Sequence, residues 1–191
     1  MKNGWDIVKD FEQSIAEYTG APYAVAVNSC TNALLLACKL FSNPVTVSVP
    51  RKTYPSVPMS VIHAGHEVKL IGMEWQGGYQ LEPLPVLDYA CRFTRNMYWP
   101  GEIQCISFAA NKILGIEQGG AILHDDEAAD SWLRCMRYDG RNESGEVEMI
   151  GYHCPILPSI AAQGLLRMND MPHSNPDVQK DYSDIPGYLF T

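Results

Sequence analysis

The stretch YAVAVNSCTNALLLAC, residues 23–38, decides the fold. Its first five residues are apolar and rich in β-forming types, which predicts a buried strand. Residues 28–31 are polar and offer caps for a helix, and the apolar run from Ala33 to Cys38 continues that helix. The stretch therefore predicts a strand, a tight turn and a helix, which is the repeating unit of an α/β protein.

The same alternation continues on both sides of this unit. Strands are predicted at 45–49, 67–71, 86–88, 103–108 and 121–124, and helices at 6–18, 55–64, 126–138 and 159–168. Alternating strands and helices indicate three α/β/α layers around a mostly parallel central sheet. We expect residues 1–150 to form this domain. Residues 151–191 would be a short C-terminal segment, vestigial or in contact with a partner, with a polar, proline-rich tail from residue 169.

Charge and composition exclude several classes of function. The net charge is -8, and the 14 lysines and arginines are scattered, which disfavours extended contact with nucleic acid or an anionic membrane. No apolar run approaches the roughly 20 residues that a membrane span needs. The six cysteines form no C-x-x-C pair and lie mostly in apolar stretches, so reduced, buried thiols and a cytoplasmic location are expected.

Metal chemistry is not predicted. The histidines do not share zinc-site spacing with cysteines or carboxylates, so structural or surface roles are expected for His63, His66, His124 and His173. The tryptophans are predicted to be core or interface residues: Trp5, Trp75, Trp99 and Trp132.

Two segments suit the two ends of an anionic aromatic ligand. The turn Ser29-Cys30-Thr31 precedes a helix, where free N–H groups and the helix dipole favour a phosphate, although such residues also cap many helices. Asp88 ends a predicted buried strand, where a carboxylate needs a partner. A pyridinium N–H is one such partner, and a helix cap or a surface ion pair is the alternative.

Two further segments follow at the next strands. Lys112 lies in a loop of small and apolar residues after the strand that ends near Ser107. A lysine partly removed from water near other cations loses its proton more readily, as imine formation requires, whereas most lysines after strands are simply solvated. Gly119 and Gly120 permit close backbone approach before the strand at 121–124, or form an ordinary β-turn.

In this order and spacing the segments resemble the DegT/StrS-like sugar aminotransferases, which are fold-type I enzymes of the aspartate aminotransferase superfamily that use pyridoxal 5′-phosphate (PLP). That family carries Ser-Gly-Thr, a Thr-aromatic pair, an Asp, Ser-Phe-x-x-x-Lys and Glu-Gly-Gly. The corresponding segments here are 29–31, Thr53-Tyr54, Asp88, 107–112 and 118–120. The resemblance covers residues 6–168 and implies a reduced version of the family's large domain.

The resemblance implies a role for each segment. Lys112 would hold PLP as a Schiff base and shuttle protons, and Asp88 would pair with the pyridine nitrogen. Ser107 and the 29–31 turn would bind the phosphate, and Tyr54 would stack on the ring. Gly151-Tyr152-His153 stands where the family has Gly-Tyr-Asn, so His153 would reach the phosphate of a neighbouring subunit's cofactor in a homodimer.

The sequence also departs from the family. The chain is much shorter than the family's, and the stretch between Tyr54 and Asp88 is shortened as well. Cys91 stands where the family has a Gln that hydrogen-bonds the cofactor, and Cys30 replaces the glycine of the phosphate turn. Thiols are weak hydrogen-bond donors, so Cys91 implies altered cofactor tuning, or Arg92 takes over that contact.

The resulting hypothesis is transfer of an amino group from an amino acid, glutamate by resemblance, to a keto sugar linked to a nucleotide. The same lysine and aspartate also serve decarboxylases, racemases and dehydratases, because fold and cofactor do not fix which bond breaks. A third hypothesis is a catalytically inactive, shortened homologue that acts as a binding subunit.

Overall fold

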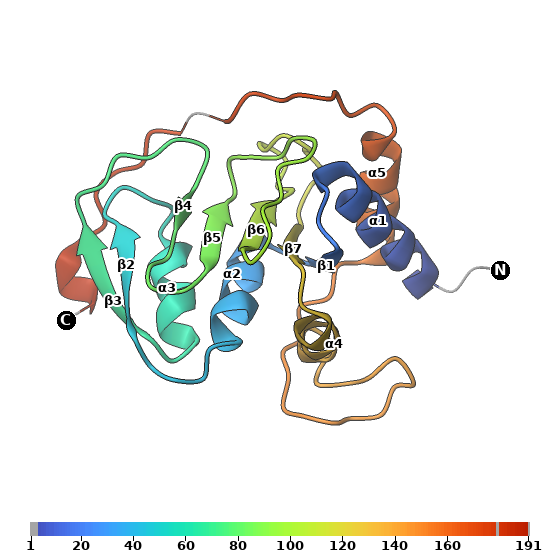
Figure 1. Cartoon of the computed structure of the whole chain (residues 1–191), viewed down its shortest axis with the longest axis horizontal. Helices are drawn as coiled ribbons and strands as arrows, with labels where there is room; N and C mark the ends of the chain where they lie inside the picture. Colours follow the sequence, from blue (N-terminus) through green and yellow to red (C-terminus); the bar gives the residue numbers. More distant parts are fainter. Residues whose placement is uncertain (1–3, 179, 191) are drawn as a thin grey trace.

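The computed structural model describes residues 4–178 and 180–190 (Figure 1). The helices are α1 (Gly4–Thr19), α2 (Cys30–Lys39), α3 (Ser56–His63), α4 (Glu127–Met136) and α5 (Pro158–Met168), and a 3-10 helix, η1, covers Gly187–Phe190. The strands are β1 (Tyr23–Val27), β2 (Thr46–Pro50), β3 (Glu67–Ile71), β4 (Tyr79–Gln80), β5 (Val86–Tyr89), β6 (Ile103–Ser107) and β7 (Gly120–His124). Every predicted helix and strand is present within a few residues, and β4 and η1 are additional.

The central sheet is mixed. Its strand order is β1-β7-β6-β5-β4, and β2 and β3 form a separate parallel pair. Only β5 and β6 pair in parallel within the five-stranded sheet, and β7 runs antiparallel to both of its neighbours. The α/β class with a central sheet is confirmed, but the sheet is less parallel than expected. The reason is local: the loop 108–119 carries no helix, so β7 returns directly beside β6 in the opposite direction.

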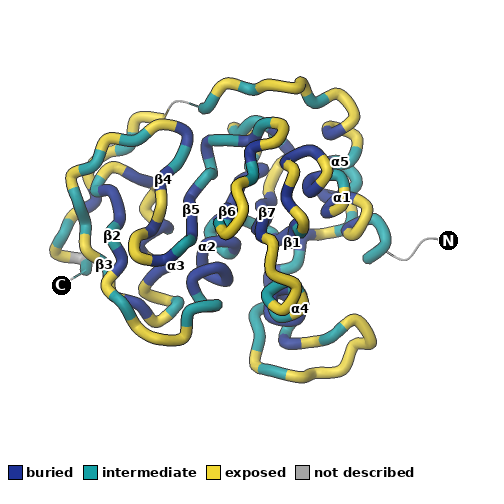
Figure 2. Tube along the Cα trace, viewed as in Figure 1, coloured by how far each residue is buried: buried dark blue, intermediate teal, exposed yellow. Residues whose placement is uncertain are grey.

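Helices cover both faces of this sheet, as predicted. Successive residues of β1 point to opposite faces: Val25 and Val27 pack in one apolar cluster with α2 and α4. Ala24 and Ala26 pack in a second cluster with α1 and α5. The buried residues accordingly follow the central strands in Figure 2.

Helix α5 shares the core of the domain that precedes it. A side chain at Gly164 would lie 2.4 Å from the ring of Phe11 on α1, so these two helices pack closely. Phe11 in turn meets Phe108, with ring centroids 5.5 Å apart, at the end of β6. The division at residues 150 and 151 stays a prediction.

All six cysteines are free and buried, which confirms the prediction for the thiols. Within residues 4–178 and 180–190, no helix is long and apolar enough to cross a membrane.

Candidate active site

The site lies at one edge of the central sheet. Strands β1, β5 and β6 run in the same direction, because β1 and β6 are both antiparallel to β7 and β5 is parallel to β6. Their carboxyl ends therefore meet at one edge, where ligands of α/β proteins bind. A cavity of about 470 Å³ opens there. It is lined by eight of the nine residues that the sequence singles out: Ser29, Cys30, Thr31, Tyr54, Asp88, Cys91, Ser107 and Lys112.

Asp88 is a buried carboxylate with neutral hydrogen-bond partners. Only 5 % of the residue is exposed. One oxygen accepts from the Tyr79 hydroxyl at 2.9 Å, and the other accepts from the Ala90 backbone N–H at 2.9 Å. Burial raises the pKa of Asp88, although these two hydrogen bonds and the charge of Lys112 oppose the rise. The carboxylate is thus suited to a ligand group that brings a positive charge or an N–H.

Lys112 carries the only amine that the sequence analysis assigns to the site. The loop after β6 turns back on itself, since the Lys112 N–H donates to the carbonyl of Ala109 at 2.8 Å. The side-chain Nζ lies 3.3 Å from the sulfur of Cys91. A thiol is a weak acceptor, so this contact leaves the amine available to an electrophile in the cavity.

Hydroxyl and backbone groups gather around the start of α2. Ser29 caps this helix, and its Oγ accepts from the N–H of Asn32 at 3.2 Å. The hydroxyls of Thr31 and Ser56 lie 2.8 Å apart. Ser107 is buried at the end of β6, and its Oγ accepts from Ala109 N–H at 3.4 Å. A helix N-terminus with several hydroxyls is a general binding site for a phosphate.

The paired glycines permit the close approach that their sequence predicts. Gly119 has a φ of +131°, a backbone conformation that few other residues adopt. A Cβ at Gly120 would lie 2.6 Å from the backbone nitrogen of Cys30. Any larger residue at position 120 would therefore push β7 away from the turn that starts α2.

Several cavity residues escaped the sequence analysis. Trp75 is predicted as a core or interface residue, but it lines the cavity and packs on Tyr79 with ring centroids 4.9 Å apart. Ser56, Lys180 and Tyr182 also line it. Trp75 and the two tail residues come from segments without a sheet-edge signal, so only the folded chain brings them to the site.

His153 lies outside this cavity. Its side chain is 71 % exposed, and Nδ1 is 2.9 Å from a carboxylate oxygen of Asp139. The sequence assigns it to a neighbouring subunit's site, and that role stays a prediction.

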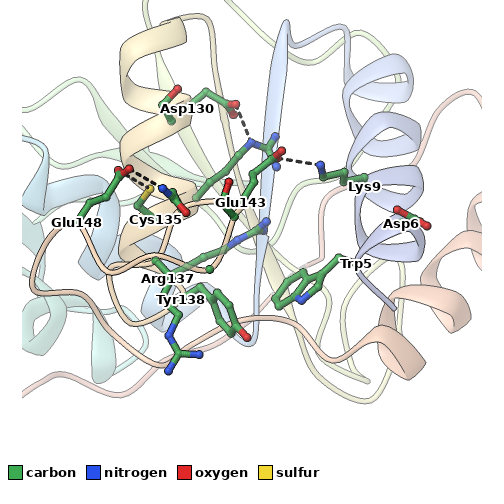
Figure 3. Close-up of a pocket in the computed structure, with 15 residues that line it drawn as sticks. Trp5, Asp6, Lys9, Asp130, Cys135, Arg137, Tyr138, Glu143 and Glu148 are labelled. Carbon is green, nitrogen blue, oxygen red and sulfur yellow. Dashed lines mark hydrogen bonds and ion pairs between the residues drawn. The ribbon is translucent and has the colours of Figure 1, made fainter. Parts of the chain in front are cut away.

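A second cavity, of about 710 Å³, lies between α1, α4 and the loop that follows α4 (Figure 3). It is larger, but three of its lining cations, Lys9, Arg134 and Arg137, are paired with carboxylates, and Arg141 lies over the ring of Tyr138. Lys9 contacts Glu143 at 2.8 Å, and Arg134 contacts Asp130 at 2.7 Å. We therefore place the chemistry at the cavity of Asp88 and Lys112, where charged groups face open space.

Comparison with known proteins shows the family of the chain. A model of the DegT/DnrJ/EryC1/StrS aminotransferase family matches residues 2–86 and 97–182. Lys112 and the turn before α2 lie within the matched ranges, and Asp88 lies between them. Among curated proteins, the spore coat polysaccharide biosynthesis protein SpsC of Bacillus subtilis (strain 168) is 25 % identical over 259 residues, covering 99 % of this chain and 66 % of that protein.

Solved structures share the fold. A putative PLP-dependent aminotransferase from Bacillus cereus ATCC 10987 is 22 % identical with a TM-score of 0.72, covering 85 % of this chain and 58 % of its own. A GDP-4-keto-6-deoxymannose-3-dehydratase with a trapped PLP-glutamate geminal diamine is 18 % identical with a TM-score of 0.69, covering 85 % of this chain and 60 % of its own. The chain thus spans less than two thirds of these relatives. The alignment with SpsC is also longer than the 191 residues of the chain, so SpsC holds extra residues inside the matched region.

Proposed function

The chain belongs to the DegT/DnrJ/EryC1/StrS aminotransferase family, and from this premise we propose that it binds PLP between Lys112 and Asp88 and transfers an amino group. The proposed donor is an amino acid, glutamate, and the proposed acceptor is a keto sugar linked to a nucleotide. One observation carries the proposal: a primary amine and a buried carboxylate without a cationic hydrogen-bond partner line the same cavity.

The residues at the cavity fit the groups of PLP one by one. Lys112 Nζ would hold the aldehyde carbon covalently, and Asp88 would accept a hydrogen bond from the ring nitrogen and keep it protonated. Ser29, Thr31 and Ser107 would donate to the phosphate at the start of α2. Cys30 is neutral there, because burial raises its pKa well above the usual value, so it adds no charge beside the phosphate.

PLP, when bound, supplies an electron sink that stabilises negative charge on the α-carbon of an amino acid. The chain itself would supply the proton transfers, with Lys112 Nζ moving a proton at that carbon. Asp88 would hold the ring proton in place, because its buried carboxylate gains a partner only when that proton is present. Tyr54, 57 % exposed at the mouth, would cover one face of the ring.

We extend the proposal to a homodimer with His153 at the neighbouring subunit's phosphate, and to the cytoplasm. The exposed imidazole of His153 has room to meet a partner, and six unpaired cysteines suit a reducing compartment. Sedimentation at micromolar concentration tests the dimer. A monomer at that concentration removes the role of His153 and leaves the cavity residues untouched.

Absorbance and product analysis test the activity. We expect the purified protein to take up PLP with a band in the visible region, and borohydride to remove that band and fix the label on Lys112 in peptide mass spectra. The variant Lys112→Ala should lack both signals. The control Lys52→Ala should keep both, because that lysine is exposed on the loop after β2. Absence of a band in wild type, or a label on another lysine, contradicts the proposal.

The reaction type is tested separately. Glutamate should discharge the band and release 2-oxoglutarate in a stoichiometric half-reaction. A dehydratase is the second candidate, because one of the similar structures carries that activity. Consumption of a keto sugar with loss of water and no net amino transfer would identify it. PLP binding without any turnover would identify a binding subunit.

A further inference from the structure

Two residues of the C-terminal tail, Lys180 and Tyr182, line the cavity of their own chain. Figure 1 shows the tail running from α5 across the top of the molecule to η1 beside β2 and β3. At the start of this path, Asn175 Nδ2 donates to the carbonyl of Phe93 at 3.0 Å, and the Tyr18 hydroxyl donates to the carbonyl of Pro172 at 2.6 Å. The tail is therefore tied to the body of the domain before it reaches the cavity.

Two sets of contacts anchor the tail before and after Tyr182 in the chain. Upstream, Asp177 accepts from Arg92 Nε at 3.0 Å and from Nη2 at 2.8 Å, a bidentate ion pair. The N–H of Val178 donates to the carbonyl of Cys91 at 2.8 Å. Downstream, the N–H of Ile185 donates to the carbonyl of Arg51 at 3.0 Å, and the Ile185 side chain is buried.

Between these anchors, Tyr182 enters an aromatic group at the mouth. Its ring stacks on Trp75, with centroids 6.0 Å apart and an interplanar angle of 24°. It meets Tyr54 edge-on at 6.4 Å. Trp75 in turn packs on Tyr79, whose hydroxyl donates to Asp88. The ring of Tyr182 is thus connected to Asp88 through a series of contacts between aromatic side chains.

Tyr182 and Cys91 line the same cavity. Burial raises the pKa of Tyr182, and the charge and hydrogen bond of Cys91 raise it further. The sulfur of Cys91 also accepts a hydrogen bond from Lys112 Nζ at 3.3 Å. Cys91 therefore contacts the tail through its carbonyl, which accepts from the Val178 N–H, and the lysine through its sulfur.

The tail borders the cavity without filling it. About 470 Å³ remains open with Tyr182 and Lys180 among the lining residues. Pockets for small ligands start at roughly 300 Å³. The tail residues therefore form part of the cavity wall and leave room for a ligand.

We propose that Tyr182 is a further cofactor-binding residue of this site: its ring, stacked on Trp75 and edge-on to Tyr54, closes the outer side of the cofactor cavity. The inference rests on the proposed binding of PLP and deepens it. It assigns the outer wall to the chain's own tail.

Two variants separate the ring from the hydroxyl. Tyr182→Ala removes both, and we expect its dissociation constant for PLP to rise about tenfold, since an aromatic contact contributes roughly 0.5–1.5 kcal/mol beyond its buried area. Tyr182→Phe keeps the ring, so its affinity should stay within about twofold of wild type. Tyr188→Ala, in η1 of the same tail and outside the cavity, is the matched control and should behave as wild type.

Trypsin gives a readout that does not depend on turnover. Cleavage after Lys180 is faster when the tail detaches from the cavity wall, so bound PLP should slow it at least several-fold in wild type and much less in Tyr182→Ala. Wild type that binds no PLP overturns the proposed function, and this inference with it. Wild type that binds PLP, with Tyr182→Ala equal to it in affinity and in cleavage, overturns this inference alone.

Discussion

Glu12 and Asp88 are both buried carboxylates, with 3 % and 5 % exposure, but their surroundings differ. Glu12 on α1 accepts from Arg134 at 2.6 Å, from Arg137, and from the Ala26 N–H at 2.8 Å. Asp88 accepts from one phenol and one backbone N–H. A buried carboxylate that is paired with arginines holds secondary-structure elements together. A buried carboxylate that accepts only from neutral groups can still bind a cationic ligand.

The two carboxylates also differ in what surrounds them. Glu12 connects α1, β1 and α4, and its two arginine partners, Arg134 and Arg137, border the cavity of Figure 3. Asp88 faces the open cavity with Lys112. The volume of a cavity is therefore a poorer guide to its chemistry than whether the charged side chains that line it already have partners of opposite charge.

The largest effect is expected from Glu12→Gln. The buried Arg137 loses its counter-charge and Arg134 keeps only Asp130, which costs about 3–5 kcal/mol of the free energy of unfolding. Urea unfolding measures it. Glu17→Gln on the exposed side of the same helix, where Glu17 accepts from Gln13, should change the value by less than about 0.5 kcal/mol. Equal losses for the two variants would break the comparison.

A smaller loss, about 1–3 kcal/mol, is expected from Tyr79→Phe, because Asp88 loses one of its two donors. The loss should shrink when Asp88 is already Asn, since the uncompensated charge is then absent. A double-mutant cycle by urea unfolding measures this coupling. Additive losses would mean that the phenol does not support the carboxylate.

Asp130 is a third carboxylate with charged partners, and the pH dependence of stability tests its role. Burial alone would raise the pKa of Asp130, but His124 and Arg134 hold it below the usual value. Its charge therefore stabilises the fold above the ordinary pKa of 3.8, and that contribution is lost as pH falls through the lowered value. Asp130→Asn should cost about 1 kcal/mol at neutral pH, with the difference from wild type fading in acid. A pH-independent difference would contradict the assigned cause.

The smallest effect, with the opposite sign, is expected from Asp88→Asn without cofactor. Because the pKa of Asp88 is raised, the folded state holds its proton longer, and stability falls as pH rises from 3.8 through the raised value. The variant should gain less than about 1 kcal/mol at neutral pH, and the gain should vanish in acid. A loss comparable to that of Glu12→Gln would make Asp88 a structural residue.

Much of the site was predictable because its residues follow strands. Asp88, Ser107 and the turn at 29–31 end β5, β6 and β1, and strands of one direction bring their ends to one edge. The antiparallel return of β7 was missed, since a predicted loop does not state its direction. The two-residue strand β4 has too few residues for a period-two pattern.

The remaining cavity residues depend on distant packing. Tyr182 arrives through anchors such as Asp177 with Arg92, and ion pairs between positions 85 residues apart leave no pattern in sequence. The burial of Glu12 could not be predicted for the same reason. An acidic residue on an amphipathic helix is expected at the surface, and only the folded chain brings Arg134 and Arg137 against it.

The central claim is that Asp88 holds a ring proton opposite Lys112, and a nitrogen chemical shift tests it most directly. PLP labelled with ¹⁵N in its ring, bound to wild type, should show a protonated pyridine nitrogen throughout neutral pH. The same cofactor bound to Asp88→Asn should show an unprotonated one. An unprotonated nitrogen in wild type, or the same shift in both proteins, would contradict the account.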